Sequence, residues 1–188
     1  MAIAINGSGT VTGISVGGLP DGIVDRDTLS TQAKGSILQV VQAVKTDISS
    51  TTSSSFGALS GLSVNITPSA TSSKILVTVD CKIGNGGAGA YIKIVRDSTD
   101  IYKGDAVSGK NSCLQQTYGG NDTGEGQYGL PFMGGTFLDS PNTTSQVTYS
   151  VQWLREGSAT IYLNRCGSDS GDYVGRTASS ITVQEVAA

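Results

Sequence analysis

The chain has 188 residues, of which 26 are glycine and only 14% are charged. Disordered chains are rich in charge and poor in β-branched residues, whereas this composition is typical of short strands joined by tight turns. The formal net charge of −3 leaves no basic surface to attract phosphate groups, so nucleic acid is not expected as a partner.

The amino terminus shows no targeting signal. The opening "MAIAINGSGT" lacks the basic residues and the apolar core of a secretory signal, and no apolar run approaches the ~20 residues that cross a bilayer. We therefore expect a protein that is made in a cytoplasm and does not insert into membranes. Reduced thiols are expected there at Cys81, Cys113 and Cys166, although a disulfide or thiol chemistry stays open for the last two.

The first 35 residues differ from the rest in being interrupted by turn signals such as Asn-Gly, Gly-Gly and Pro-Asp-Gly. Ile14 and Val16 predict a brief strand, and residues 25–34 predict one or two helical turns between an Asp25 N-cap and Gly35. Such short pieces cannot bury a core by themselves. We expect residues 1–35 to form an extended attachment or oligomerisation arm, whose apolar contacts would come from Ile3, Ile5, Ile14, Val16, Leu19, Ile23, Val24 and Leu29.

From residue 36 onward the pattern is that of β-strands. The segment "ILQVVQAVK" opens this body, and after a Ser/Thr-rich loop at 47–55 the residues Leu62, Val64 and Ile66 alternate with polar ones. Pro68 cannot donate to a sheet and ends that strand. Further strands are predicted at 74–83, 90–97, 101–104, 114–118, 130–138, 146–153, 159–165 and 178–186.

The segment 74–83 shows the clearest division into two faces. One face carries the charged and polar residues, with Leu76 as an exception, and the other is apolar and must point into a core: Ile75, Val77, Val79, Cys81 and Ile83. The glycine-rich "GNGGAG" at 84–89 then predicts a hairpin with positive φ angles, from which residues 90–97 return antiparallel.

Short strands with turns at intervals of about 8 to 12 residues predict an all-β protein. The expected architecture is an antiparallel β-sandwich, most simply a jelly roll, formed by residues 36–188 behind the extended N-terminal arm. No internal repeat is evident, which disfavours a solenoid.

The sequence gives little support for a catalytic function. The chain contains no histidine, and the carboxylate pairs Asp122 with Glu125 and Asp169 with Asp172 lie in Gly/Ser loops, where acidic residues are ordinary turn formers. The same loops, 120–126 and 167–173, match no calcium motif. We expect no enzyme activity, no metal site and no cofactor, with a small hydrolase that uses these carboxylates as a remote alternative.

Aromatic residues suggest one binding alternative. Trp153 continues the apolar face of its strand and is expected in the core. Tyr118 and Tyr128 lie among glycine and polar residues of the long excursion 105–129 and are the candidates for an exposed contact with a sugar. A carbohydrate-binding module is therefore a second functional hypothesis, although packing is the commoner role of aromatic residues.

Four phrases together, "INGSGTVTGISVGGLPDGIVD", "ILQVVQAVKTD", "LSVNITPSATSSKILVTVD" and "TYSVQWL", resemble short tail-fibre-like virion proteins of tailed bacteriophages that infect cyanobacteria and marine bacteria. The resemblance implies a non-enzymatic virion component, usually a homotrimer of β-rich subunits with an N-terminal attachment segment.

No coiled coil, β-helix or collagen-like shaft is visible, so the body cannot reach far from a surface. We therefore expect a capsid decoration (cement) protein on the virion, with the major capsid protein or tail proteins as partners. The alternative is a short tail fibre or fibre tip that binds host-surface carbohydrate.

Overall fold

The structure, a computed structural model, describes residues 4–5, 11–12, 37–118, 128–172 and 174–187. The chain divides into two compact units, residues 1–36 and 37–188. In the first unit, β1 (Ala4–Ile5) pairs antiparallel with β2 (Val11–Thr12). The strand predicted at Ile14 and Val16 and the helical turns predicted at 25–34 lie outside the described residues, as do all the predicted arm contacts except Ile5.

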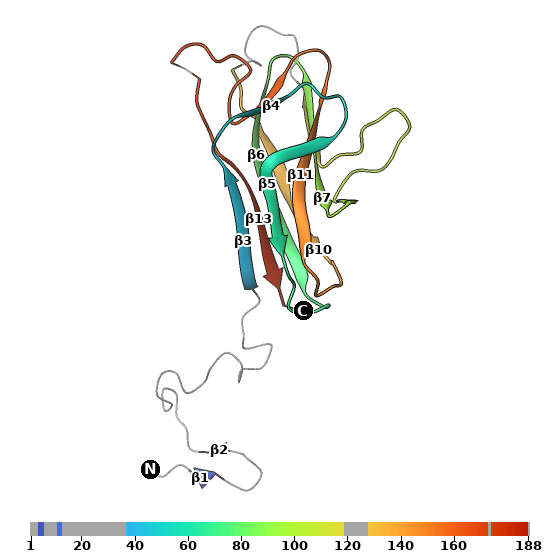
Figure 1. Cartoon of the computed structure of the whole chain (residues 1–188), viewed down its shortest axis with the longest axis vertical. Helices are drawn as coiled ribbons and strands as arrows, with labels where there is room; N and C mark the ends of the chain where they lie inside the picture. Colours follow the sequence, from blue (N-terminus) through green and yellow to red (C-terminus); the bar gives the residue numbers. More distant parts are fainter. Residues whose placement is uncertain (1–3, 6–10, 13–36, 119–127, 173, 188) are drawn as a thin grey trace. The chain divides into compact units, whose positions relative to one another are not determined.

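The second unit consists of two antiparallel sheets packed face to face (Figure 1). The first sheet contains β3 (Ile37–Lys45), β13 (Ser179–Val186), β6 (Lys74–Asn85) and β10 (Phe132–Asp139), with β12 (Ile161–Leu163) and β4 (Ser49–Thr51) as a short extension. The second sheet contains β5 (Gly57–Ile66), β11 (Val147–Glu156), β7 (Gly89–Arg96), β8 (Thr99–Ile101) and β9 (Gln115–Tyr118).

The order of the strands is that of a jelly roll. Successive long strands alternate between the sheets, and the neighbours are β3-β13-β6-β10 in the first sheet and β5-β11-β7 in the second, where β7 also pairs with β8 and β9. Every pairing is antiparallel. The predicted jelly-roll-like β-sandwich is therefore confirmed.

The core lies between the sheets and contains the apolar face predicted for 74–83. Ile75, Val77, Val79, Cys81 and Ile83 are all buried, and so is Trp153. Burial raises the pKa of the Cys81 thiol to about 12, so this side chain acts as a small apolar group. Cys113 and Cys166 are free thiols as well.

The hairpin predicted at 84–89 is wrong. β6 pairs with β10, β12 and β13, whereas β7 belongs to the other sheet and pairs with β8, β9 and β11. The turn, which includes Gly87 at φ +102°, therefore carries the chain from one sheet to the other. Gly84 serves a different purpose, because a Cβ there would lie 2.2 Å from the carbonyl oxygen of Arg165.

Two further boundaries differ from the prediction. The Ser/Thr segment 47–55, predicted as a loop, contains β4, in which Thr51 pairs with Ile161. β5 begins at Gly57, ahead of the alternating residues 62–66, because Gly61 at φ +88° lets the strand bend where the β5–β11 register shifts.

Candidate functional site

The outward-facing side of the first sheet exposes large apolar side chains. We call this surface the outer face. Its exposed apolar residues are Ile37, Val40, Val44, Phe132 and Leu138, and its half-buried ones are Leu76 and Val186. Apolar surface of this kind on a folded domain commonly marks a place where another molecule binds.

Strand register places part of this surface in one row. Gln184 lies opposite Val40 on one side and Leu76 on the other, and Leu76 in turn lies opposite Leu138. Leu76, the exception in the predicted pattern, therefore lies in a row that crosses four strands and is apolar except at Gln184. Side chains that are aligned across a sheet in this way pack as a unit.

The next row of the outer face is polar but uncharged. The amide nitrogen of Gln42 donates to Thr182 Oγ1 at 2.7 Å, and the hydroxyls of Thr78 and Thr136 are 3.3 Å apart. These side chains satisfy one another and leave little unpaired polarity. A partner that covers this row would not have to compensate buried charges.

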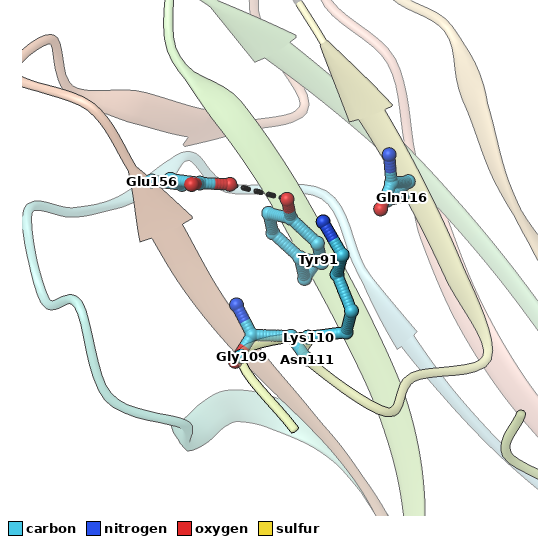
Figure 2. Close-up of a pocket in the computed structure, with 6 residues that line it drawn as sticks. All are labelled: Tyr91, Gly109, Lys110, Asn111, Gln116 and Glu156. Atoms are coloured by element: carbon cyan, nitrogen blue, oxygen red, sulfur yellow. Dashed lines mark hydrogen bonds between the residues drawn. The ribbon is translucent and has the colours of Figure 1, made fainter. Parts of the chain in front are cut away.

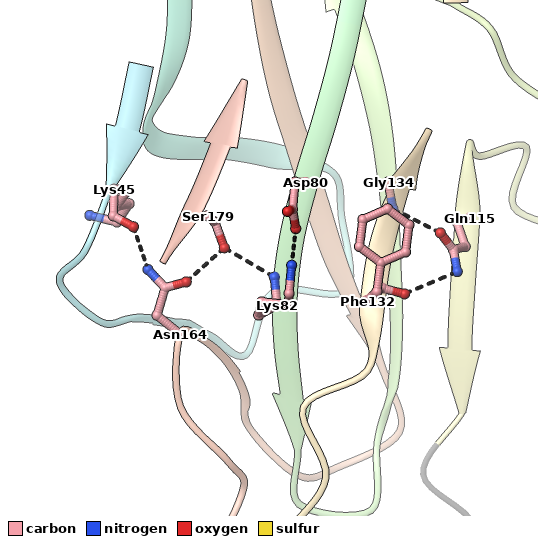
Figure 3. A network of polar contacts seen from close by, with 8 residues as sticks. All are labelled: Lys45, Asp80, Lys82, Gln115, Phe132, Gly134, Asn164 and Ser179. Atoms are coloured by element: carbon pink, nitrogen blue, oxygen red, sulfur yellow. Dashed lines mark hydrogen bonds and ion pairs between the residues drawn. The ribbon is translucent and has the colours of Figure 1, made fainter. Parts of the chain in front are cut away.

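Charge is confined to β6. Lys82 forms an ion pair with Asp80 and its ammonium lies 5.1 Å from the centre of the Phe132 ring, as Figure 3 shows together with the neighbouring polar contacts. Lys74 donates to Ser140 at 2.9 Å. Depletion of charge with retained aromatic and aliphatic side chains is the composition of interface cores.

The two edges of the first sheet differ. At the β10 edge, the Gln115 side chain donates to Phe132 O at 3.2 Å and accepts from Gly134 N at 2.8 Å, so an amide from the second sheet occupies the position of a further strand (Figure 3). At the β3 edge no further strand follows among the described residues. The outward positions there are Ile37, Val40, Gln42 and Val44, without the lysine or proline that usually protects an edge.

The buried side-chain amide of Asn164 links β3, β6 and β13 near Lys45, Lys82 and Ser179. Asn164, at φ +62°, donates to the carbonyl oxygens of Lys45 and Asp47 at 2.8 and 3.0 Å and accepts from Ser179 Oγ at 2.6 Å. Ser179 Oγ in turn accepts from Lys82 N at 3.0 Å. The outer face is therefore presented by strands of fixed register (Figure 3).

A second feature lies on the outward side of the second sheet. A polar pocket of about 290 Å³ is lined by Tyr91, Gly109, Lys110, Asn111, Gln116 and Glu156 (Figure 2). Tyr91 is almost fully buried in its wall and donates a short hydrogen bond to the Glu156 carboxylate. Several of these residues belong to the excursion 105–129 that the sequence marked as a surface segment.

Of the two predicted tyrosines, Tyr128 is not among the described residues that line this pocket. Tyr118 ends β9 but its side chain is not described, and Tyr128 is exposed near Cys166, whose thiol contacts the Tyr128 carbonyl oxygen at 3.0 Å. Tyr91 was not singled out from the sequence. Its outward position could have been inferred, because it alternates with the buried Ile92 and Ile94 face of β7.

Of the four predicted loop carboxylates, the structure describes Asp169 and Asp172. Asp169 is bound by Arg165 at 3.1 Å and by Arg176 at 2.6 Å, and Asp172 is exposed. Asp122 and Glu125 lie outside the described residues. Among the residues that the structure describes, no cluster of His, Cys, Asp and Glu is arranged to hold a metal ion, and no helix is long and apolar enough to cross a membrane.

Comparison with known proteins gives no match to a family model and no match to a curated protein. The outer face and the polar pocket are therefore interpreted from their own chemistry.

Proposed function

We propose that the protein is a non-enzymatic structural subunit of a tailed-bacteriophage particle. In this proposal it is a homotrimeric cement protein that decorates the capsid and is attached through its N-terminal arm, residues 1–35. The outer face carries the proposal, because it combines exposed apolar side chains with charge confined to β6, beside a strand β3 that has no further neighbour among the described residues, and such a surface is suited to binding a second copy of the same chain.

Two other observations support this role. Jelly rolls are used both in viral capsids and in lectins, so the fold is compatible with it, although a fold by itself does not assign a function. The resemblance of the arm and of the strand segments to tail-fibre-like virion proteins supports a role in the virion, and the lack of a visible shaft in the sequence favours the capsid over a fibre that reaches a receptor. The arm would provide attachment, and the outer face would hold the copies together.

Substitution of Val40 by lysine is expected to convert the homotrimer into monomers. Val40 is 57% exposed in the single chain, and an unpaired ammonium buried between copies costs several kcal/mol. We expect the self-association to weaken by at least about tenfold. Sedimentation velocity of the full chain at several concentrations measures this change.

Val107→Lys is the matched control for that experiment. Val107 is 59% exposed but belongs to the segment that follows β8 rather than to the outer face. The Val107→Lys substitution should leave the association state unchanged. A wild-type chain that remains monomeric at micromolar concentration would contradict the proposal, and so would equal effects of the two lysines.

Deletion of residues 1–35 tests the attachment role of the arm. The remaining body contains both sheets and the core, so we expect it to stay folded, with a thermal transition close to that of the full chain. Its binding to particles should be lost. Electron microscopy of particles with gold-labelled protein measures both binding and position. Label on capsids supports decoration, whereas label on tails assigns the fibre role. Undiminished binding of the shortened chain would show that the arm is not the attachment element.

A further inference from the structure

The polar pocket is assembled from four parts of the chain. Tyr91 comes from β7 and Gln116 from β9, Glu156 ends β11, and the segment between β8 and β9 contributes Gly109, Lys110 and Asn111 (Figure 2). At about 290 Å³ its volume lies at the lower end of the range for ligand sites, roughly 300–1,000 Å³. Its size is suited to a small polar group rather than to a large molecule.

The segment that closes the pocket is held by its own hydrogen bonds. Gly104 N donates to Cys113 O at 3.1 Å, which joins its two ends, and Lys110 N donates to Val107 O at 3.0 Å across a turn completed by Gly109 at φ +74°. These bonds hold the backbone of the segment in place before any ligand binds, and the Lys110 side chain lies near Tyr91 (Figure 2). Such preorganisation reduces the entropy that binding costs.

The pocket keeps hydrogen-bond donors and acceptors available for a ligand. Tyr91 donates to one oxygen of the Glu156 carboxylate, which leaves the other oxygen as an acceptor. The ammonium of Lys110 forms no ion pair with Glu156 or with any other described carboxylate. The side-chain amides of Asn111 and Gln116 supply further donors and acceptors at the rim.

This combination excludes three ligand classes. One carboxylate beside an ammonium does not make a cation site. Phosphate and sulfate find no net attraction, because the negative charge of Glu156 cancels the positive charge of Lys110. An apolar ligand would leave the polar side chains of the wall unpaired. A neutral molecule whose groups both donate and accept hydrogen bonds meets all the requirements, and a sugar ring carries several such hydroxyls.

We propose that this pocket binds a neutral saccharide, through one sugar unit at the end of a chain. The second carboxylate oxygen of Glu156 accepts from a hydroxyl, Lys110 donates to a hydroxyl or to the ring oxygen, and Tyr91 forms the wall. The sugar site does not depend on the trimer or on the capsid attachment, so it can fail while the structural role stands.

The test measures binding of the full-length protein to immobilised neutral, sulfated and phosphorylated oligosaccharides. We expect binding to neutral members, reduced at least about tenfold by Glu156→Gln and by Lys110→Ala, since each removes a hydrogen bond to a charged group. Lys103→Ala is the matched control: Lys103 lies at the start of the same segment, where its ammonium is 3.4 Å from Asp100, and it should bind like the wild type.

Thermal melting of each variant verifies that it is folded. Three results would overturn the proposal: no neutral saccharide bound at millimolar concentration, retention of sulfated or phosphorylated members only, or affinities that Glu156→Gln and Lys110→Ala leave unchanged. In the last case Tyr128→Ala shows whether the exposed tyrosine binds the sugar instead. The oligomer test with Val40→Lys uses no saccharide and is unaffected by any of these outcomes.

Discussion

Asp139→Ala is expected to lower the free energy of unfolding by about 3 to 5 kcal/mol, which is the typical cost of removing one partner from a buried ion pair. Asp139 lies on β10 of the first sheet, and its partners lie on the second. It accepts from Arg96 Nη1 at 2.7 and 2.9 Å and from the Tyr149 hydroxyl at 2.6 Å. The alanine leaves the fully buried Tyr149 hydroxyl without this acceptor.

The electrostatics of the pair are consistent with this expectation. Burial, together with the hydrogen bond to Asp139, raises the pKa of Tyr149 above its ordinary value. Burial alone would lower the pKa of the Arg96 guanidinium, but its hydrogen bonds to Asp139 outweigh burial and raise it. Both partners therefore depend on the negative charge of Asp139.

Asp100→Ala is the matched control for this change. Asp100 pairs with Lys93 at 2.8 Å within the second sheet and is more exposed than Asp139, so its removal should cost no more than about 1 kcal/mol. Urea denaturation measures the free energy of unfolding of both variants, and the two can be compared if its dependence on urea concentration is unchanged. A loss for Asp139→Ala no larger than for Asp100→Ala would show that this contact does not hold the sheets together.

The strands of the body could be predicted where their two faces differ in polarity. The alternation in 74–83 placed Cys81 in the core because a one-residue shift would have buried Lys82. The same criterion is uninformative for β3, where Val40 and Val44 are exposed while Val41 packs against the core. Alternation cannot identify the outer face of a strand whose two sides are both apolar.

The connection at 84–89 could not be assigned by composition. Glycines permit a hairpin and a crossing between sheets equally well, and the choice is made by distant partners: β6 is already paired with β10 on one side and with β13 and β12 on the other. These partners lie 50 residues or more along the chain. The polar pocket has the same origin, because Tyr91 meets Glu156 across 65 residues only after β7 and β11 pair.

Glu185→Gln is expected to lower the free energy of unfolding by about 2 kcal/mol at neutral pH, as hydrogen bonds to a charged group contribute roughly 1.5 to 3 kcal/mol. One oxygen of the fully buried carboxylate accepts from Ser69 N at 2.7 Å and Ser69 Oγ at 2.6 Å, and the other accepts from Gln39 Nε2 at 2.6 Å. A glutamine would direct its own NH₂ group at one of these donors. Gln39 cannot turn to compensate without losing its 2.7 Å bond to Thr67 O.

The pH dependence of this effect separates charge from shape. Burial alone would raise the pKa of Glu185, but the hydrogen bonds from Ser69 and Gln39 outweigh it and hold the pKa below its ordinary value of 4.5. The group therefore binds fewer protons in the folded chain than in the unfolded chain, and its stabilisation is complete above pH 4.5 and is lost as the pH falls through the folded value.

The free-energy difference between the wild type and Glu185→Gln should accordingly be constant near neutral pH and shrink in acid, as measured by urea denaturation over a pH series. Asp172→Asn, the equivalent substitution at an exposed carboxylate, should change the free energy of unfolding by no more than about 0.5 kcal/mol. A difference that shrinks as the pH rises above 4.5 would mean that burial dominates and that Glu185 is folded into the protein as the neutral acid.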